Sequence, residues 1–200
     1  MSGFLANFRT TMIVSVIIAL VIVISYKMHP GTLAPERYWE AVFRWLHVFM
    51  GILWIGLLYY FNFVQIRKMP EIPAELKPAV SKYIAPEALF WFRWSALLTV
   101  IMGLVIAFQR GYIVDSLALG LTNGNARDSF IGLGMWLGII MMINVWAFIW
   151  PNQKIALGIV EADADAKAKA ARVAMLASRT NMLLSLPMLT AMAMYQTLFG

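Results

Sequence analysis

The chain has no cysteine among its 200 residues, and only 13% of its residues are charged. The missing cysteine excludes disulfides, thiolate metal sites, cysteine nucleophiles and a covalently attached c-type haem. A soluble domain of this length is about half apolar and about a quarter charged. This chain is 62% hydrophobic with a mean hydropathy of +0.74, so its composition indicates one domain embedded in a bilayer.

Acidic residues and histidines are also scarce. Ten acidic residues face sixteen basic ones, which gives a net charge of +6, and the two histidines are His29 and His47. The basic residues flank apolar runs and form no patch with interleaved aromatic residues. We therefore interpret them as signals of membrane topology and expect membrane lipid, not nucleic acid, as the surroundings.

Long apolar runs are abundant. A helix needs about 20 apolar residues to cross the hydrocarbon core. We predict an all-α polytopic bundle with five transmembrane helices at about 10–27, 42–64, 89–109, 129–150 and 181–199, forming one membrane domain over residues 1–200. The Ala-rich segment at about 155–178 places acids before bases, an order that suits the helix macrodipole, so we expect a further helix there.

The distribution of basic residues predicts the orientation. If the N-terminus lies in the cytoplasm, that side receives Arg9 and the connections 65–93 and 151–180, which together hold eleven of the sixteen basic residues. Cytoplasmic loops carry the excess of Lys and Arg. We therefore predict a cytoplasmic N-terminus, a cytoplasmic Ala-rich helix and a periplasmic C-terminus, in a multi-pass protein of the bacterial inner membrane.

The second span begins with "RWLHVFMGILWIG" and carries the only histidine inside an apolar run, His47. Steps of three and four residues place His47 and Gly51 on one helix face, which should turn toward the bundle near the outer surface. Gly51 leaves a notch that a flat macrocycle could occupy, and histidine is a common haem ligand. Three interpretations stay open: a haem-iron ligand, a hydrogen-bonded structural histidine, and another metal or proton role.

The other spans carry polar and small residues at helical spacing. Gly134 and Gly138 form a small-xxx-small pair that favours close approach of two helices. In the fifth span Met188 and Met192 are candidate second ligands for a haem held by His47. We predict a hydrogen-bonded interhelical cluster in the cytoplasmic half, formed by Asn62, Gln65, Ser95, Asn144, Asn181 and Ser185.

Four stretches in series resemble one family. They are "RWLHVFMGILWIG" followed by "YYFN", "FWFRWSALLTVIMG", "NVWAFIWPNQK" and "SRTNMLLSLPML". Together they resemble the urate oxidase N-terminal domain, the membrane domain of bacterial cytochrome c-linked urate hydroxylases and of shorter stand-alone relatives. The resemblance implies a helical membrane protein associated with respiratory or oxidative electron transfer, with a cytochrome c or other membrane subunits as partners.

The chain departs from that family pattern in ways that bear on function. It has no Cys-x-x-Cys-His and lacks a glycine- and histidine-containing stretch that larger members have between the second and third motifs. The last span of the family tends to end with a histidine, and alignment of "LPML" places Gln196 at that position. The resemblance thus implies a two-residue site at the outer end, formed here by His47 and Gln196, with Gly51 and Met192 beside them.

Three functions follow from these observations. The first is an electron-transfer protein that binds b-type haem near the periplasmic face through His47. The second is a cofactor-free accessory subunit of a larger energy-transducing membrane complex. The third is part of a urate-oxidising membrane enzyme, an oxidoreductase of the urate hydroxylase type. We expect the chain not to be an enzyme on its own, because no catalytic base or substrate pocket is evident in the sequence.

Overall fold

The structure, a computed structural model, describes residues 5–27 and 35–199, and these residues form helices joined by short turns, without a strand. Within these residues, five helices are long and apolar enough to cross a membrane, as the sequence predicted. His29 lies outside the described residues. The contacts divide the chain into two compact units, Met1–Val42 and Phe43–Gly200.

The first unit contains α2 (Phe8–Lys27) and the start of α3 (Pro35–Tyr59). No side chain in the apolar window of α2, Phe8–Ser25, is buried. The hydroxyl of Tyr38 donates a hydrogen bond to the Val23 carbonyl at 3.0 Å, and the Lys27 ammonium lies 5.5 Å from the centre of the Tyr38 ring. These contacts tie the end of α2 to the beginning of α3.

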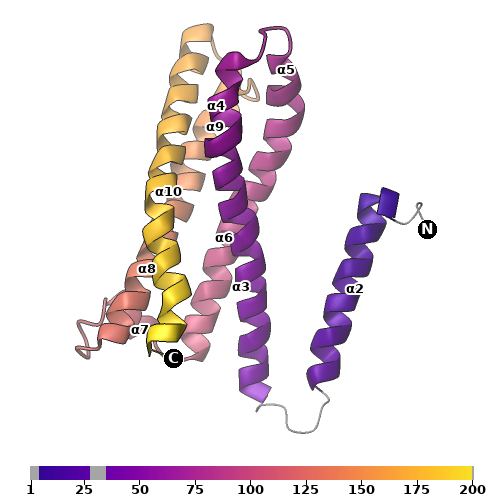
Figure 1. Cartoon of the computed structure of the whole chain (residues 1–200). Helices are drawn as coiled ribbons and strands as arrows, with labels where there is room; N and C mark the ends of the chain where they lie inside the picture. The colour runs from indigo at the N-terminus through magenta and orange to yellow at the C-terminus, as the bar shows by residue number, and fades with distance from the viewer. Residues whose placement is uncertain (1–4, 28–34, 200) are drawn as a thin grey trace. The chain divides into compact units, whose positions relative to one another are not determined.

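The second unit is a bundle of four long helical stretches (Figure 1). The first is α3, which continues through η1 (Tyr60–Gln65), α4 (Ile66–Lys68) and η2 (Met69–Glu71). The second runs through α5 (Lys77–Ala79), η3 (Val80–Ile84) and α6 (Ala85–Gln109), and the third through α8 (Ala126–Asn144), η4 (Val145–Ile149) and α9 (Trp150–Ala156). The fourth is α10 (Ala164–Phe199), which packs against α8, η4 and α9.

Two turns separate the later helices. Short α7 (Ile113–Leu117) packs on α8, whose N-terminus is capped by Asn125, because the Asn125 side chain accepts a hydrogen bond from the Arg127 backbone amide at 3.0 Å. Between α9 and α10, Gly158 adopts a positive φ of 74°, and the Asp163 carboxylate accepts a hydrogen bond from the Ala166 amide. The Ala-rich segment therefore begins its helix at Ala164, not near residue 155, and continues into the fifth span as one helix.

Three of the long stretches contain a π-helical turn: η1, η3 and η4. Two of these turns end just before a proline near the start of the next helix, Pro86 in α6 and Pro151 in α9. Proline has no amide hydrogen and its ring crowds the carbonyl four residues earlier, so a widened turn relieves the clash. The prolines thus account for the positions of η3 and η4.

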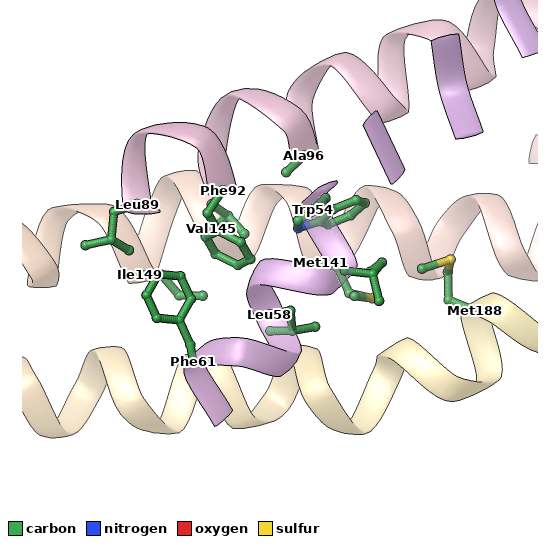
Figure 2. Close-up of a cluster of buried hydrophobic side chains, with 11 residues drawn as sticks. Trp54, Leu58, Phe61, Leu89, Phe92, Ala96, Met141, Val145, Ile149 and Met188 are labelled. Carbon is green, nitrogen blue, oxygen red and sulfur yellow. The ribbon is translucent and has the colours of Figure 1, made fainter. Parts of the chain in front are cut away.

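The core lies between α3, α6, α8 and α10 (Figure 2). Its centre holds Trp54, Leu58 and Met141, each at most 1% exposed. Phe61 and Phe92 meet edge to face with ring centres 5.5 Å apart. This dense packing lies toward the end of the bundle that contains α9, which we call the α9 end; the opposite end, which contains α7, is the α7 end.

Candidate cofactor cavity

A cavity of about 570 Å³ lies within the second unit, toward the α7 end. That volume is within the range of small-molecule and cofactor sites. The walls come from α3, α6, α8 and α10 and are mostly apolar, with Ile55, Val100 and Ile131 among them. Ile52 also lines the cavity and is 69% exposed, so the cavity opens beside α3.

His47 lines this cavity and is held by a hydrogen bond across the bundle. Its Nδ1 lies 2.8 Å from the carbonyl oxygen of Thr99 on α6. Since a carbonyl can only accept, Nδ1 carries the proton, and in the neutral imidazole the lone pair then resides on Nε2. This arrangement is the one that metal-binding histidines use, because the partner of one ring nitrogen fixes the tautomer and orientation of the other.

Gly103 provides the space for the imidazole. A Cβ atom at Gly103 would lie 2.9 Å from Cε1 and 3.1 Å from Nδ1 of His47, closer than side chains normally approach. Gly51, which the sequence suggested as the notch, also lines the cavity, but a Cβ atom there would meet Thr99 Cγ2 at an ordinary 3.7 Å. The glycine that approaches the His47 ring closely is therefore Gly103 of α6, and not Gly51 of α3.

The structure brings all four predicted cofactor-site residues to this one cavity: His47, Gly51, Met192 and Gln196. Met188, the other candidate ligand, lines it too and is 6% exposed. Gln196 is exposed, and among the described residues it makes no hydrogen bond with His47. The two residues share a cavity without forming the direct pair that an amide and an imidazole could form.

Several other wall residues were not among the predicted site residues. Arg44 and Arg110 bring two positive charges to the α7 end of the cavity, and Tyr112 and Tyr195 bring two phenol rings. Tyr195 is fixed in place by Arg127, whose Nε donates to the Tyr195 hydroxyl at 2.8 Å. Arg110 and Tyr112 belong to the connection after the third span, so periodicity within a span gave no signal for them.

Trp54 forms part of the cavity wall as well as of the core. Its side chain is 1% exposed, yet its indole Nε1 has no hydrogen-bond partner among the described residues. A buried N–H group without a partner is costly and usually marks a place where another group binds. The wall therefore contains one polar donor that the protein itself leaves unsatisfied.

The predicted interhelical polar cluster lies toward the α9 end and divides into separate contacts. The Asn144 amide donates to Asn181 Oδ1 at 2.7 Å, and the Asn181 amide donates to the Met141 carbonyl at 3.0 Å. The Asn62 amide donates to the Ser178 hydroxyl at 3.0 Å, and the Ser185 hydroxyl lies 3.3 Å from the Tyr59 hydroxyl. Each of these four contacts includes a residue of α10.

Two members of the predicted cluster take no part in it. Ser95 is buried, but its hydroxyl donates to carbonyls of its own helix, those of Trp91 and Phe92. Gln65 has a buried Oε1 atom with no hydrogen-bond partner among the described residues. The cluster therefore joins α3 and α8 to α10, whereas α6 contributes no side chain to it.

Comparison with known proteins supports the resemblance for the C-terminal part of the chain. Residues 113–199 match the urate oxidase N-terminal family. The matched segment contains two of the four stretches that suggested this family, "NVWAFIWPNQK" and "SRTNMLLSLPML". It also includes Met192 and Gln196 in the cavity wall, whereas His47 lies before it. Comparisons with curated proteins and with solved structures gave no match.

Proposed function

We propose that this protein is a multi-pass membrane protein of respiratory or oxidative electron transfer that holds a b-type haem in the cavity, with Nε2 of His47 as an iron ligand. The observation that carries the proposal is the hydrogen bond from Nδ1 of His47 to the Thr99 carbonyl, because it leaves Nε2 as the coordinating nitrogen. The family match and the membrane-spanning lengths of the helices support it.

The residues of the cavity have chemistry that suits this group. A bound haem supplies one-electron redox chemistry. The Thr99 carbonyl orients the imidazole, and Gly103 keeps space open beside the ring. Met192 or Met188 supplies a thioether as second ligand, and Arg44 and Arg110 supply cations for the carboxylate groups of a porphyrin. The apolar walls exclude water from the rest of the cavity.

The wider setting belongs to the same proposal. The chain lies in the bacterial inner membrane with its N-terminus in the cytoplasm, so the α7 end faces the periplasm, where a cytochrome c or another membrane subunit accepts electrons. The excess of basic residues near the α9 end supports this orientation.

A visible spectrum of the purified protein tests the proposal. We expect a Soret band, with sharp α and β bands after reduction by dithionite, and loss of these bands in His47→Ala. Ser95→Ala is the matched control, because Ser95 is a buried polar residue of α6 whose hydrogen bonds stay within its helix. A colourless wild-type protein that was expressed with adequate haem supply would overturn the proposal.

Two measurements on membranes separate the alternative functions. A colourless protein that migrates with other subunits in native gels of solubilised membranes would be an accessory subunit of a larger complex. Urate turnover by membranes with and without the protein tests the third function, and equal turnover would exclude a role in urate oxidation.

A further inference from the structure

Arg93 occupies an unusual position for a cation within a membrane-spanning helix. Its guanidinium carbon lies 3.9 Å from the centre of the Trp150 ring and 5.3 Å from that of Phe90. The ammonium of Lys154, one turn further along α9, lies 5.7 Å from the same Trp150 ring. Two cations from α6 and α9 thus converge on one indole ring, toward the α9 end and away from the cavity.

Neither cation is neutralised by a carboxylate of the described residues. Within residues 5–27 and 35–199, no carboxylate forms a salt bridge with Arg93 or Lys154. Nη1 of Arg93 is buried and has no hydrogen-bond partner, and no described residue accepts from the other two nitrogens of its guanidinium. Charged groups in membrane spans usually pair with a group of opposite charge, and the aromatic rings supply no such charge, so Arg93 and Lys154 remain able to bind an anion.

The aromatic side chains near Arg93 also contact one another and the Arg93 backbone. The indole N–H of Trp146 donates to the Arg93 carbonyl at 3.1 Å, and the rings of Trp94 and Trp146 meet edge to face at 5.3 Å. The guanidinium of Arg93 lies over the Trp150 ring, and the planar edge of a guanidinium matches the oxygens of a phosphate. The aromatic residues therefore hold the arginine in a form ready to bind an anion.

The depth in the membrane favours one source of phosphate. Trp150 and Lys154 lie near the end of a membrane-spanning stretch that ends at Ala156. Tryptophan and basic residues concentrate where helices pass through the headgroup layer, and anionic lipids are attracted to such clusters.

We propose that Arg93, Lys154 and Trp150 form a phosphate-binding site occupied by the headgroup of an anionic phospholipid. The guanidinium edge and the ammonium bind the phosphate oxygens, and Trp150 positions the guanidinium. The lipid then bridges α6 and α9 on the surface of the bundle. This site is separate from the cavity, so it does not depend on haem binding.

Native mass spectrometry of the full chain tests the proposal. The protein is extracted in mild detergent and mixed with phosphatidylglycerol or phosphatidylcholine. We expect wild type to retain phosphatidylglycerol in preference to phosphatidylcholine, and Arg93→Gln and Lys154→Gln to bind it about tenfold more weakly, as loss of one charge-assisted hydrogen bond predicts. Arg67→Gln is the matched control, since Arg67 is an exposed cation of α4.

Further measurements identify the source of the phosphate and exclude misfolding. Thermal stabilisation by phosphatidylglycerol but not by inorganic phosphate supports a lipid headgroup as the occupant. Equal stabilisation by inorganic phosphate alone would overturn the lipid proposal and indicate a free anion. Arg93→Lys keeps the charge but loses the planar edge, so we expect intermediate retention. Equal retention of both lipids by wild type, or unchanged retention by helical, monodisperse Arg93→Gln, would overturn the site.

Discussion

Trp54, Leu58 and Phe61 pack into a continuous core, whereas Arg44, His47 and Gly51 of the same helical stretch line a cavity that extends alongside that core to Ile55 and Tyr59. The difference comes from residue size at facing positions. The cavity wall contains Gly103 of α6 and Gly138 of α8, as well as Gly51 of α3. The core contains the larger residues Phe92 of α6 and Met141 of α8. One bundle thus combines a filled half that supplies stability with a hollow half that is available for a ligand.

The largest expected effect comes from emptying the filled half. Phe92 is 1% exposed and its ring contacts that of Phe61. We expect Phe92→Ala to lower the free energy of unfolding by about 3–5 kcal/mol, because a large cavity remains where the ring was. Equilibrium unfolding by SDS in mixed micelles, followed by circular dichroism, measures this loss. Ile52→Ala at the exposed cavity rim is the control, and an equal loss there would contradict the division into halves.

Two glycines of α8 sharpen the comparison within a single helix. A Cβ atom at Gly134 would lie 2.9 Å from Cβ of Ala191, whereas a Cβ atom at Gly138 would meet no heavy atom within 4 Å. We expect Gly134→Ala to destabilise the protein by about 1–3 kcal/mol by forcing α8 and α10 apart. Gly138→Ala should be neutral or stabilising, as alanine favours the helix. The same unfolding titration checks both, and equal losses would argue against the cavity beside Gly138.

A smaller effect is expected from the polar contacts of the filled half. Asn181 is fully buried and makes two hydrogen bonds to α8, one with Asn144 and one with the Met141 carbonyl. We expect Asn181→Ala to cost about 1–2 kcal/mol in the unfolding titration, because interhelical hydrogen bonds in membranes are individually modest. Ser95→Ala removes only bonds within α6 and should change stability by less than about 0.5 kcal/mol. A larger loss of stability in Ser95→Ala than in Asn181→Ala would contradict the role of Asn181 in joining α8 to α10.

The smallest expected change in stability comes from the hollow half, where haem content is the quantity to measure. Gly103→Ala places a Cβ atom 2.9 Å from Cε1 of His47, so the imidazole must turn or shift. We expect stability to change by less than about 1 kcal/mol, because the ring can move into the cavity, while the haem-to-protein absorbance ratio falls. Gly51→Ala, with an ordinary contact of 3.7 Å, should retain haem. Equal haem content in both variants would contradict the role of Gly103.

The sequence predicted the faces of single helices well. The five membrane-length helices agree with the structure. His47 and Gly51 both line the cavity, as expected of residues that share one helix face. That Met192 and Gln196 of another helix lie in the same cavity was implied by the family resemblance, not by periodicity. Haem binding and membrane orientation stay predictions. The resemblance to the urate oxidase N-terminal family rested on four short motifs, of which the later two lie within the matched residues 113–199.

What the sequence could not predict was the register between helices. Thr99 and Gly103 were on an inward face of the third span, yet nothing in the sequence indicated that they would meet His47. The same limit explains Ser95, whose hydroxyl bonds its own helix instead of the predicted cluster. Relative translation of two helices depends on how their side chains interlock, and that information is not contained in either helix alone.

The π-helical turns described in the fold have a consequence for alignment and engineering. Each holds one residue more than the α-helical turn it replaces, so it acts as an insertion absorbed without a loop. Every residue after η4 is therefore displaced in phase by about 100° relative to an uninterrupted helix. Trp150 follows η4 directly and lies over Arg93 in this phase. Deleting one residue from 145–149 would convert the π-helical turn to an α-helical one. Trp150 would then rotate away from Arg93, and the contact between its ring and the guanidinium would be lost.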